Sequence, residues 1–75
     1  MFKSIAEIKE YVDNGCKPVY WKNTNYEVRK FYFPKRKVSE FYVCCFSNKS
    51  AFGLTYEDEN GEEQLNGKLE DFFIQ

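Results

Sequence analysis

The sequence predicts an α+β fold: an N-terminal helix packed on a small, strongly bent antiparallel sheet of about five strands. Apolar residues recur at helical spacing only between residues 4 and 13, and alternation with a period of two follows from residue 19. Tight-turn sequences such as Asn60-Gly61 and Asn66-Gly67 separate the later apolar runs. The chain of 75 residues is long enough for one domain, residues 1–75. We expect an SH3-like or similar small barrel, with an open meander as the alternative.

The predicted helix spans residues 4–13. Ser4 and Glu7 have the spacing of a capping box, in which the Ser4 hydroxyl accepts a hydrogen bond from the Glu7 amide. Gly15 suits the left-handed conformation that commonly follows the last turn of a helix. Residues at helical spacing form one apolar face: Ile5, Ile8, Tyr11 and Val12.

Short strands and turns are predicted to occupy the chain after Gly15. The segment 41–46 is apolar at every position, which is typical of a central strand covered on both faces. Its period of two directs Phe41, Val43 and Cys45 to the core and the residues between them to the opposite face. The other strands are expected at residues 19–21, at 26–29, along the alternating Phe52, Leu54 and Tyr56, and at 62–65; an extension of the strand at 26–29 to residue 33 is left open. Near the C-terminal end, four apolar residues are expected to close the core: Leu69, Phe72, Phe73 and Ile74.

Fifteen aromatic residues are more than a domain of this size can bury completely. Surplus aromatic rings on a surface indicate a binding face. Trp21, together with Tyr20 and Tyr26, has the composition of a groove for proline-rich peptides, although a core position for Trp21 is the favoured interpretation.

The charges of the chain are divided between two segments. Residues 27–49 carry six Lys or Arg against two Glu, whereas residues 57–75 carry seven acids against one Lys. Opposite fields on a nearly neutral molecule orient a partner more than they add affinity. We predict two partner-binding patches: Arg29, Lys30, Tyr32, Lys35, Arg36 and Lys37 in a basic aromatic segment, and Glu57, Asp58, Glu59, Glu62 and Glu63 at an acidic hairpin.

These patches lead to two hypotheses about function. The first is a non-enzymatic module that binds another protein. The alternative is a single-stranded nucleic-acid-binding small β-barrel, in which the basic side chains contact phosphates and the rings stack on bases. The acidic third of the chain would repel a nucleic acid, which favours the first hypothesis. The acidic hairpin is interpreted as a solvated tip, ahead of a Ca²⁺ or Mg²⁺ site or a mimic of phosphates.

The residue types present argue against an enzyme, a metal and a cofactor. The chain has no histidine, which is the commonest general base, and its cysteines have no metal-binding spacing. An odd count of three cysteines, with Cys44 and Cys45 adjacent, predicts reduced thiols, and Cys16 is interpreted as structural. Because residues 1–7 lack an apolar signal core and no run is long enough to span a membrane, we expect a cytoplasmic protein without membrane contact. The sequence carries no indication of an oligomeric state.

Three segments of the chain carry a resemblance to known proteins: residues 21–28, Gly53-Leu54-Thr55 and residues 65–72. They resemble segments of small uncharacterised proteins of tailed phages and bacterial prophages, in which a helix precedes a compact β unit. The resemblance covers most of the chain and implies no catalytic residue. It implies an accessory protein that binds and modulates or inhibits a host protein, such as a defence nuclease.

Overall fold

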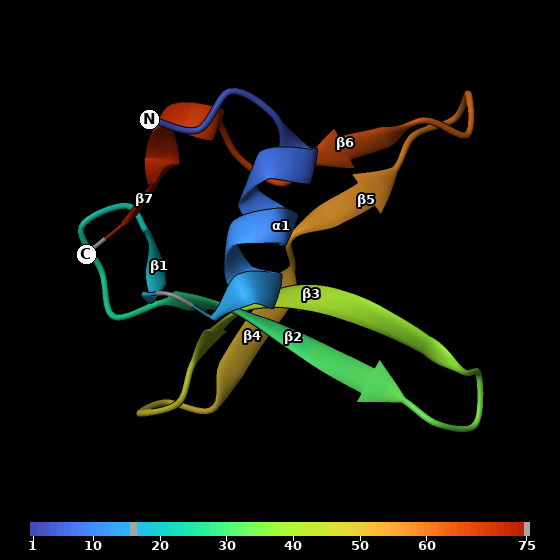
Figure 1. Ribbon diagram of the computed structural model, residues 1–75, viewed down its shortest axis with the longest axis horizontal. Coiled ribbons are helices and arrows are strands. Elements are labelled where there is room, and N and C mark those ends of the chain that lie inside the picture. Colours follow the sequence, from blue (N-terminus) through green and yellow to red (C-terminus); the bar gives the residue numbers. More distant parts are fainter. Residues whose placement is uncertain (16, 75) are drawn as a thin grey trace.

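The computed structural model describes residues 1–15 and 17–74, and this part of the chain contains one α-helix and two antiparallel sheets (Figure 1). The elements are, in chain order, α1 (Ile5–Asn14), β1 (Val19–Trp21), β2 (Glu27–Phe33), β3 (Val38–Cys45), β4 (Ser50–Gly53), β5 (Thr55–Glu57), β6 (Glu63–Leu65), the 3₁₀ helix η1 (Leu69–Asp71) and β7 (Phe72–Ile74).

The larger sheet has five strands in the order β4-β3-β2-β1-β7, and every pairing in it is antiparallel. Trp21 on β1 and Phe52 on β4 have ring centroids 5.0 Å apart, although β2 and β3 lie between their strands. The sheet is therefore strongly bent, and the predicted α+β class with a helix on a five-stranded antiparallel sheet is confirmed. Within residues 1–15 and 17–74 the outer strands β4 and β7 do not pair, so closure into an SH3-like barrel is not confirmed.

Helix α1 begins and ends at the residues that the capping signals indicate. The Ser4 Oγ accepts a hydrogen bond of 3.1 Å from the Glu7 amide, which has no partner within the first helical turn. Gly15 ends the helix in the left-handed conformation, with φ of 65°. Ile8 is buried at the centre of the helix face that packs on the sheet.

Replacing Ser4 by alanine should lower the free energy of unfolding by about 0.5–2 kcal/mol, because the Glu7 amide loses its acceptor. Chemical denaturation of the two proteins measures this difference. The change Ser39→Ala, at an exposed position of β3, is the matched control and should have little effect. Equal midpoints for wild type and Ser4→Ala would contradict the role of this cap.

The core lies between α1 and the concave face of the bent sheet. Val43 is fully buried on β3, and Phe41 packs against the same cluster, as their alternation predicts. Trp21 and Tyr26 also pack against the core, with their rings 5.4 Å apart, which agrees with the core position favoured for Trp21. The buried members of the cluster are Phe2, Ile8, Val19, Val28, Val43, Leu54 and Phe72.

Two expectations about packing were wrong. Phe73 and Ile74 do not close the core: their exposed fractions are 39% and 44%, against 1% for Phe72. They lie on the short edge strand β7, where the period of two turns Phe73 away from the core, and Ile74 is the last residue of the strand. The alternation from Phe52 to Tyr56 is also not one strand, because the chain leaves the larger sheet at Leu54 and enters the β5–β6 hairpin.

Candidate binding surface

Strand β2 divides the predicted basic aromatic segment between the two faces of the larger sheet. Successive side chains of a strand point to opposite faces. Lys30 lies on the helix-covered face with Val28, and its Nζ forms an ion pair with Asp13 of α1. Tyr32 points to the same face of the sheet as Lys30 and is 62% exposed. Arg29 lies on the opposite face, so the predicted patch is not one continuous surface.

The face of the sheet opposite α1 carries a cluster of four aromatic side chains. The register of β2 and β3 pairs Arg29 with Tyr42 and Phe33 with Val38, which brings the outward-facing rings of the two strands together. Ring centroids of Tyr42 lie 5.8 Å from Phe31 and 6.3 Å from Phe33, both in edge-to-face geometry. We call this cluster the outer-face aromatic patch; its members are Phe31, Phe33, Tyr42 and Phe46.

The outer-face aromatic patch surrounds a shallow hollow of about 360 Å³. Phe31 and Phe46 are 38% and 60% exposed, so both rings keep part of their surface in contact with water. Cys44 and Ala51 contribute further apolar lining. Sequence reasoning placed Tyr42 and Phe46 on this face but did not select them or Phe31 and Phe33 as binding residues, although the period of two along β2 is the signal that identifies them.

Two arginines lie over rings of this patch, and each has a carboxylate partner. The guanidinium of Arg29 lies 5.3 Å from the centroid of Phe46, and its Nε is 2.8 Å from the Glu27 carboxylate. The guanidinium of Arg36 lies 4.7 Å from the centroid of Phe33 and pairs with Glu40, four residues away. Both cations are therefore partly neutralised, and each lies over one ring of the patch.

Three further lysines lie in the turns at the two ends of β3. Lys35 and Lys37 lie in the β2–β3 turn, and Lys49 lines the hollow from the β3–β4 turn. All three are exposed, and none forms an ion pair with a described residue. Together with Arg29 and Arg36 these lysines are five cations against the two glutamates that pair with the arginines, so the surroundings of the patch have a net positive charge.

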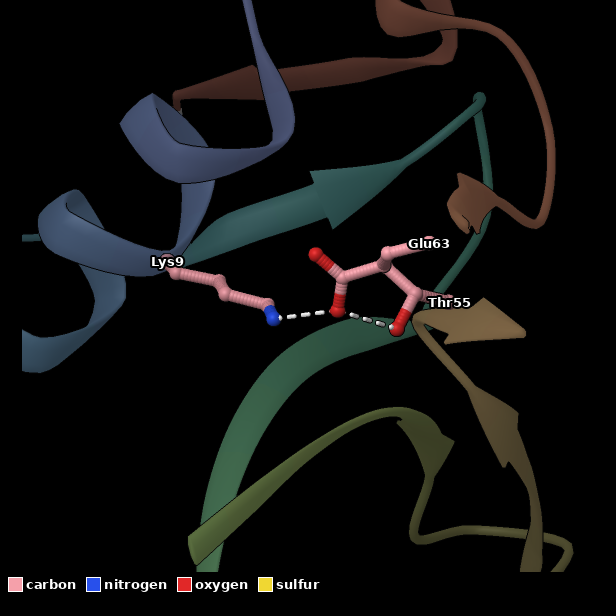
Figure 2. Close-up of polar contacts among 3 residues, drawn as sticks. All are labelled: Lys9, Thr55 and Glu63. Atoms are coloured by element: carbon pink, nitrogen blue, oxygen red, sulfur yellow. Dashed lines mark hydrogen bonds and ion pairs between the residues drawn. The ribbon is translucent and has the colours of Figure 1, made fainter. Parts of the chain in front are cut away.

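The acidic hairpin uses two of its five predicted binding residues to hold its own structure. The Glu63 carboxylate accepts hydrogen bonds from Lys9 of α1, at 2.6 Å, and from Thr55 of β5, at 3.0 Å (Figure 2). These contacts, that of Lys9 foremost, lower the pKa of Glu63. Glu57, Glu59 and Glu62 remain exposed. In Figure 1 this hairpin and the β2–β3 hairpin project to the same side of the molecule as separate arms.

Asp58 closes the turn between β5 and β6. Its carboxylate accepts hydrogen bonds from the amides of Glu62 and Asn60 and from the side chain of Gln64, each at 2.9 Å. These donors, the Glu62 amide foremost, stabilise the ionised form and lower the pKa of Asp58. Asp58 is therefore a turn-forming residue, and its carboxylate is not free for a partner.

The lowered pKa of Asp58 predicts a dependence of stability on pH. A carboxyl group with a lower pKa in the folded state stabilises the fold above its ordinary pKa, and this contribution disappears as the pH falls through the folded pKa. The isosteric change Asp58→Asn should thus be destabilising at neutral pH. The difference between wild type and variant, measured by urea denaturation, should shrink below about pH 4. A difference that is the same at neutral and acidic pH would contradict the role assigned to the charge.

The adjacent thiols have different surroundings. Cys44 and Cys45 are both buried and form no disulfide, and Cys16 lies outside the described residues. Burial raises the pKa of Cys44, and the Ser47 hydroxyl, 3.2 Å from the Cys45 Sγ, lowers the pKa of Cys45. No group of three metal-binding side chains occurs among residues 1–15 and 17–74.

Comparisons with models of protein families, with curated proteins and with solved structures find no significant match to this chain. In the part of the chain that the structure describes, no helix is both long and apolar enough to cross a membrane.

Proposed function

We propose that this domain is a non-enzymatic protein-binding module and that the outer-face aromatic patch is its contact surface. The observation that carries the proposal is the gathering of four rings around one hollow on the sheet face opposite α1, with Phe31 and Phe46 partly exposed to water. Exposed apolar clusters with a polar border are typical of interaction sites. Aromatic side chains in such clusters usually supply most of the binding energy.

The surroundings of the rings favour a protein over a single-stranded nucleic acid. Base stacking needs free ring faces, whereas Arg29 and Arg36 lie over Phe46 and Phe33. Of the cations near the rings, Arg29 and Arg36 already pair with glutamates, which leaves Lys35, Lys37 and Lys49 as the ones that could contact phosphates. Exposed carboxylates on the β5–β6 hairpin would repel a phosphate backbone and would help to orient a protein partner.

The resemblance to phage accessory proteins defines the setting of the proposal. The partner would be a host protein in the cytoplasm, such as a defence nuclease, and binding would modulate or inhibit it. The exposed Glu57, Glu59 and Glu62 would form a second, steering contact. The basic turn residues Lys35, Arg36 and Lys37 would contact the partner at the border of the patch.

A capture experiment with matched variants tests the proposal. Wild type, the double variant Phe31→Ala/Phe46→Ala and the control Phe73→Ala, which removes an exposed ring elsewhere, are incubated with nuclease-treated host lysate. Wild type and control should retain the same protein, which is then purified. The double variant should bind it at least about thirtyfold more weakly by calorimetry, as expected for the loss of about 2 kcal/mol from interface anchors.

A separate binding assay tests the nucleic-acid alternative. Labelled oligothymidine and oligouridine are titrated with the protein at moderate salt, and binding is followed by fluorescence anisotropy. Tight binding of either oligonucleotide that the combined change Lys35→Ala/Arg36→Ala/Lys37→Ala removes would replace the protein-binding proposal.

A further inference from the structure

The lining of the hollow restricts which side chain can enter it. Phe31, Phe33, Tyr42 and Phe46 surround it, and Cys44 and Ala51 add apolar atoms. Apart from the Tyr42 and Ser50 hydroxyls and the Lys49 ammonium at its edge, the side chains of the lining offer no strong hydrogen-bond partner, so a charged or amide group would lose hydration over most of the hollow. The hollow of about 360 Å³ is therefore suited to an apolar anchor, such as one aromatic or leucine side chain.

The charge of the border restricts what flanks that anchor. Lys35, Lys37 and Lys49 have no carboxylate partner among the described residues, in contrast to Arg29 and Arg36. A partner segment rich in lysine or arginine would meet a border of like charge. A segment with aspartate or glutamate beside the anchor would meet charges of opposite sign.

Lys49 is the lysine that lies closest to the anchor site. Lys37 and Lys49 occupy turn positions with φ angles of 55° and 56°, in the left-handed region that glycine and asparagine adopt more readily than lysine, as does Lys22 outside the patch. Lys49 also lines the hollow, which places its charge beside the anchor site.

We infer that the occupant of the outer-face aromatic patch is an acidic segment of another protein, which inserts one aromatic or leucine side chain between the rings and directs its carboxylates to Lys35, Lys37 and Lys49. The inference rests on the proposed function and specifies the chemistry of the partner. A second copy of the chain would have to bring its own acidic β5–β6 hairpin, with the half-exposed Tyr56, to this face. Such a contact joins different surfaces of the two copies and tends to propagate into open chains.

Selection from a library of random displayed peptides tests the inference even while the partner is unidentified. Peptides are selected on wild type and counter-selected on Phe31→Ala/Phe46→Ala, with circular dichroism as the check that the variant is folded. Enriched peptides should combine aspartate or glutamate with an aromatic residue or leucine. The best peptide is then synthesised for kinetic measurements with the immobilised protein.

The kinetic measurements separate the charge of the border from general charge effects. Lys49→Glu should slow association several-fold and weaken its salt dependence, whereas Lys3→Glu, an exposed lysine on the N-terminal segment, should change neither. Lys49→Asn should raise the denaturation midpoint and still weaken binding, because asparagine tolerates the left-handed backbone but lacks the charge.

Each other outcome overturns a specific statement. Peptides that need Phe31 and Phe46 but show no acidic preference refute the inference and leave the proposed function standing. If no peptide is enriched, or if the peptides bind wild type and Phe31→Ala/Phe46→Ala equally well, the result counts against both the inference and the proposed function. Concentration-dependent self-association in light scattering that Tyr56→Ala abolishes identifies a second copy as the occupant instead.

Discussion

Replacing Phe72 by alanine is expected to lower the free energy of unfolding by about 3–5 kcal/mol. Phe72 is 1% exposed and is the largest fully buried side chain of the domain. Its removal leaves a cavity that the surrounding core cannot refill completely, in addition to the lost burial of the ring. A domain of this size has a total stability on the order of 5 kcal/mol, so the variant should be largely unfolded at physiological temperature.

The neighbouring Phe73 provides a control of the same residue type on the same strand. Its ring is 39% exposed and contacts Tyr20 at a centroid distance of 6.2 Å. Phe73→Ala should therefore cost about 1–2.5 kcal/mol, less than Phe72→Ala, because only partial burial of the ring and one aromatic pair are lost. Urea denaturation followed by tryptophan fluorescence measures both variants. Equal losses for the two changes would refute the assignment of Phe72 to the core and Phe73 to the edge.

Gly67→Ala is expected to lower the free energy of unfolding by about 1–3 kcal/mol, because the backbone at this position has φ of 130°, which only glycine adopts without strain. A Cβ atom here would also lie 3.3 Å from the Asp71 Oδ2 and 3.5 Å from the Trp21 Nε1. The Asp71 carboxylate accepts a hydrogen bond from the Lys68 amide, so it cannot move away freely. Strain and crowding therefore act in the same direction.

The turn glycine of the β5–β6 hairpin separates these two effects. Gly61 has φ of 79°, and a Cβ atom there would meet nothing within 4 Å. Asparagine tolerates a positive φ, so Gly61→Asn should cost less than about 1 kcal/mol. Thermal unfolding of both variants by circular dichroism gives the comparison. A larger loss for Gly61→Asn than for Gly67→Ala would contradict the role of close packing at Gly67.

The features of this fold that depend on interactions between near neighbours in the chain are predicted well from the sequence. The Ser4 cap and Gly15 define α1 because capping groups act on amides and carbonyls within one turn of them. Asn60-Gly61 predicts the β5–β6 hairpin because the conformation of a tight turn depends on its own residues. Alternation along residues 41–46 correctly separates Val43 from Tyr42, since the period of two is a property of the strand itself.

The candidate site is harder to predict from the sequence, because residues that are adjacent in sequence point to opposite faces of the sheet when they lie on a strand. Residues 29–37 read as one basic aromatic patch, but alternate side chains of β2 lie on opposite faces. Lys30 pairs with α1, whereas Phe31 joins Tyr42 of β3 on the other side. Joining these rings requires the β2–β3 register, and identifying which cations are free requires their contacts with Glu27 and Glu40.

By itself, then, the sequence determined the helix, the tight turns, the alternation of the strands and the segregation of charge, all of which depend on interactions between near neighbours in the chain. Only the tertiary structure decided that Phe73 is exposed and Phe72 buried, that the chain passes from the larger sheet to the β5–β6 hairpin at Leu54, and that four rings gather on the sheet face opposite α1. Burial depends on which distant segment covers a side chain, and no local pattern specifies that segment.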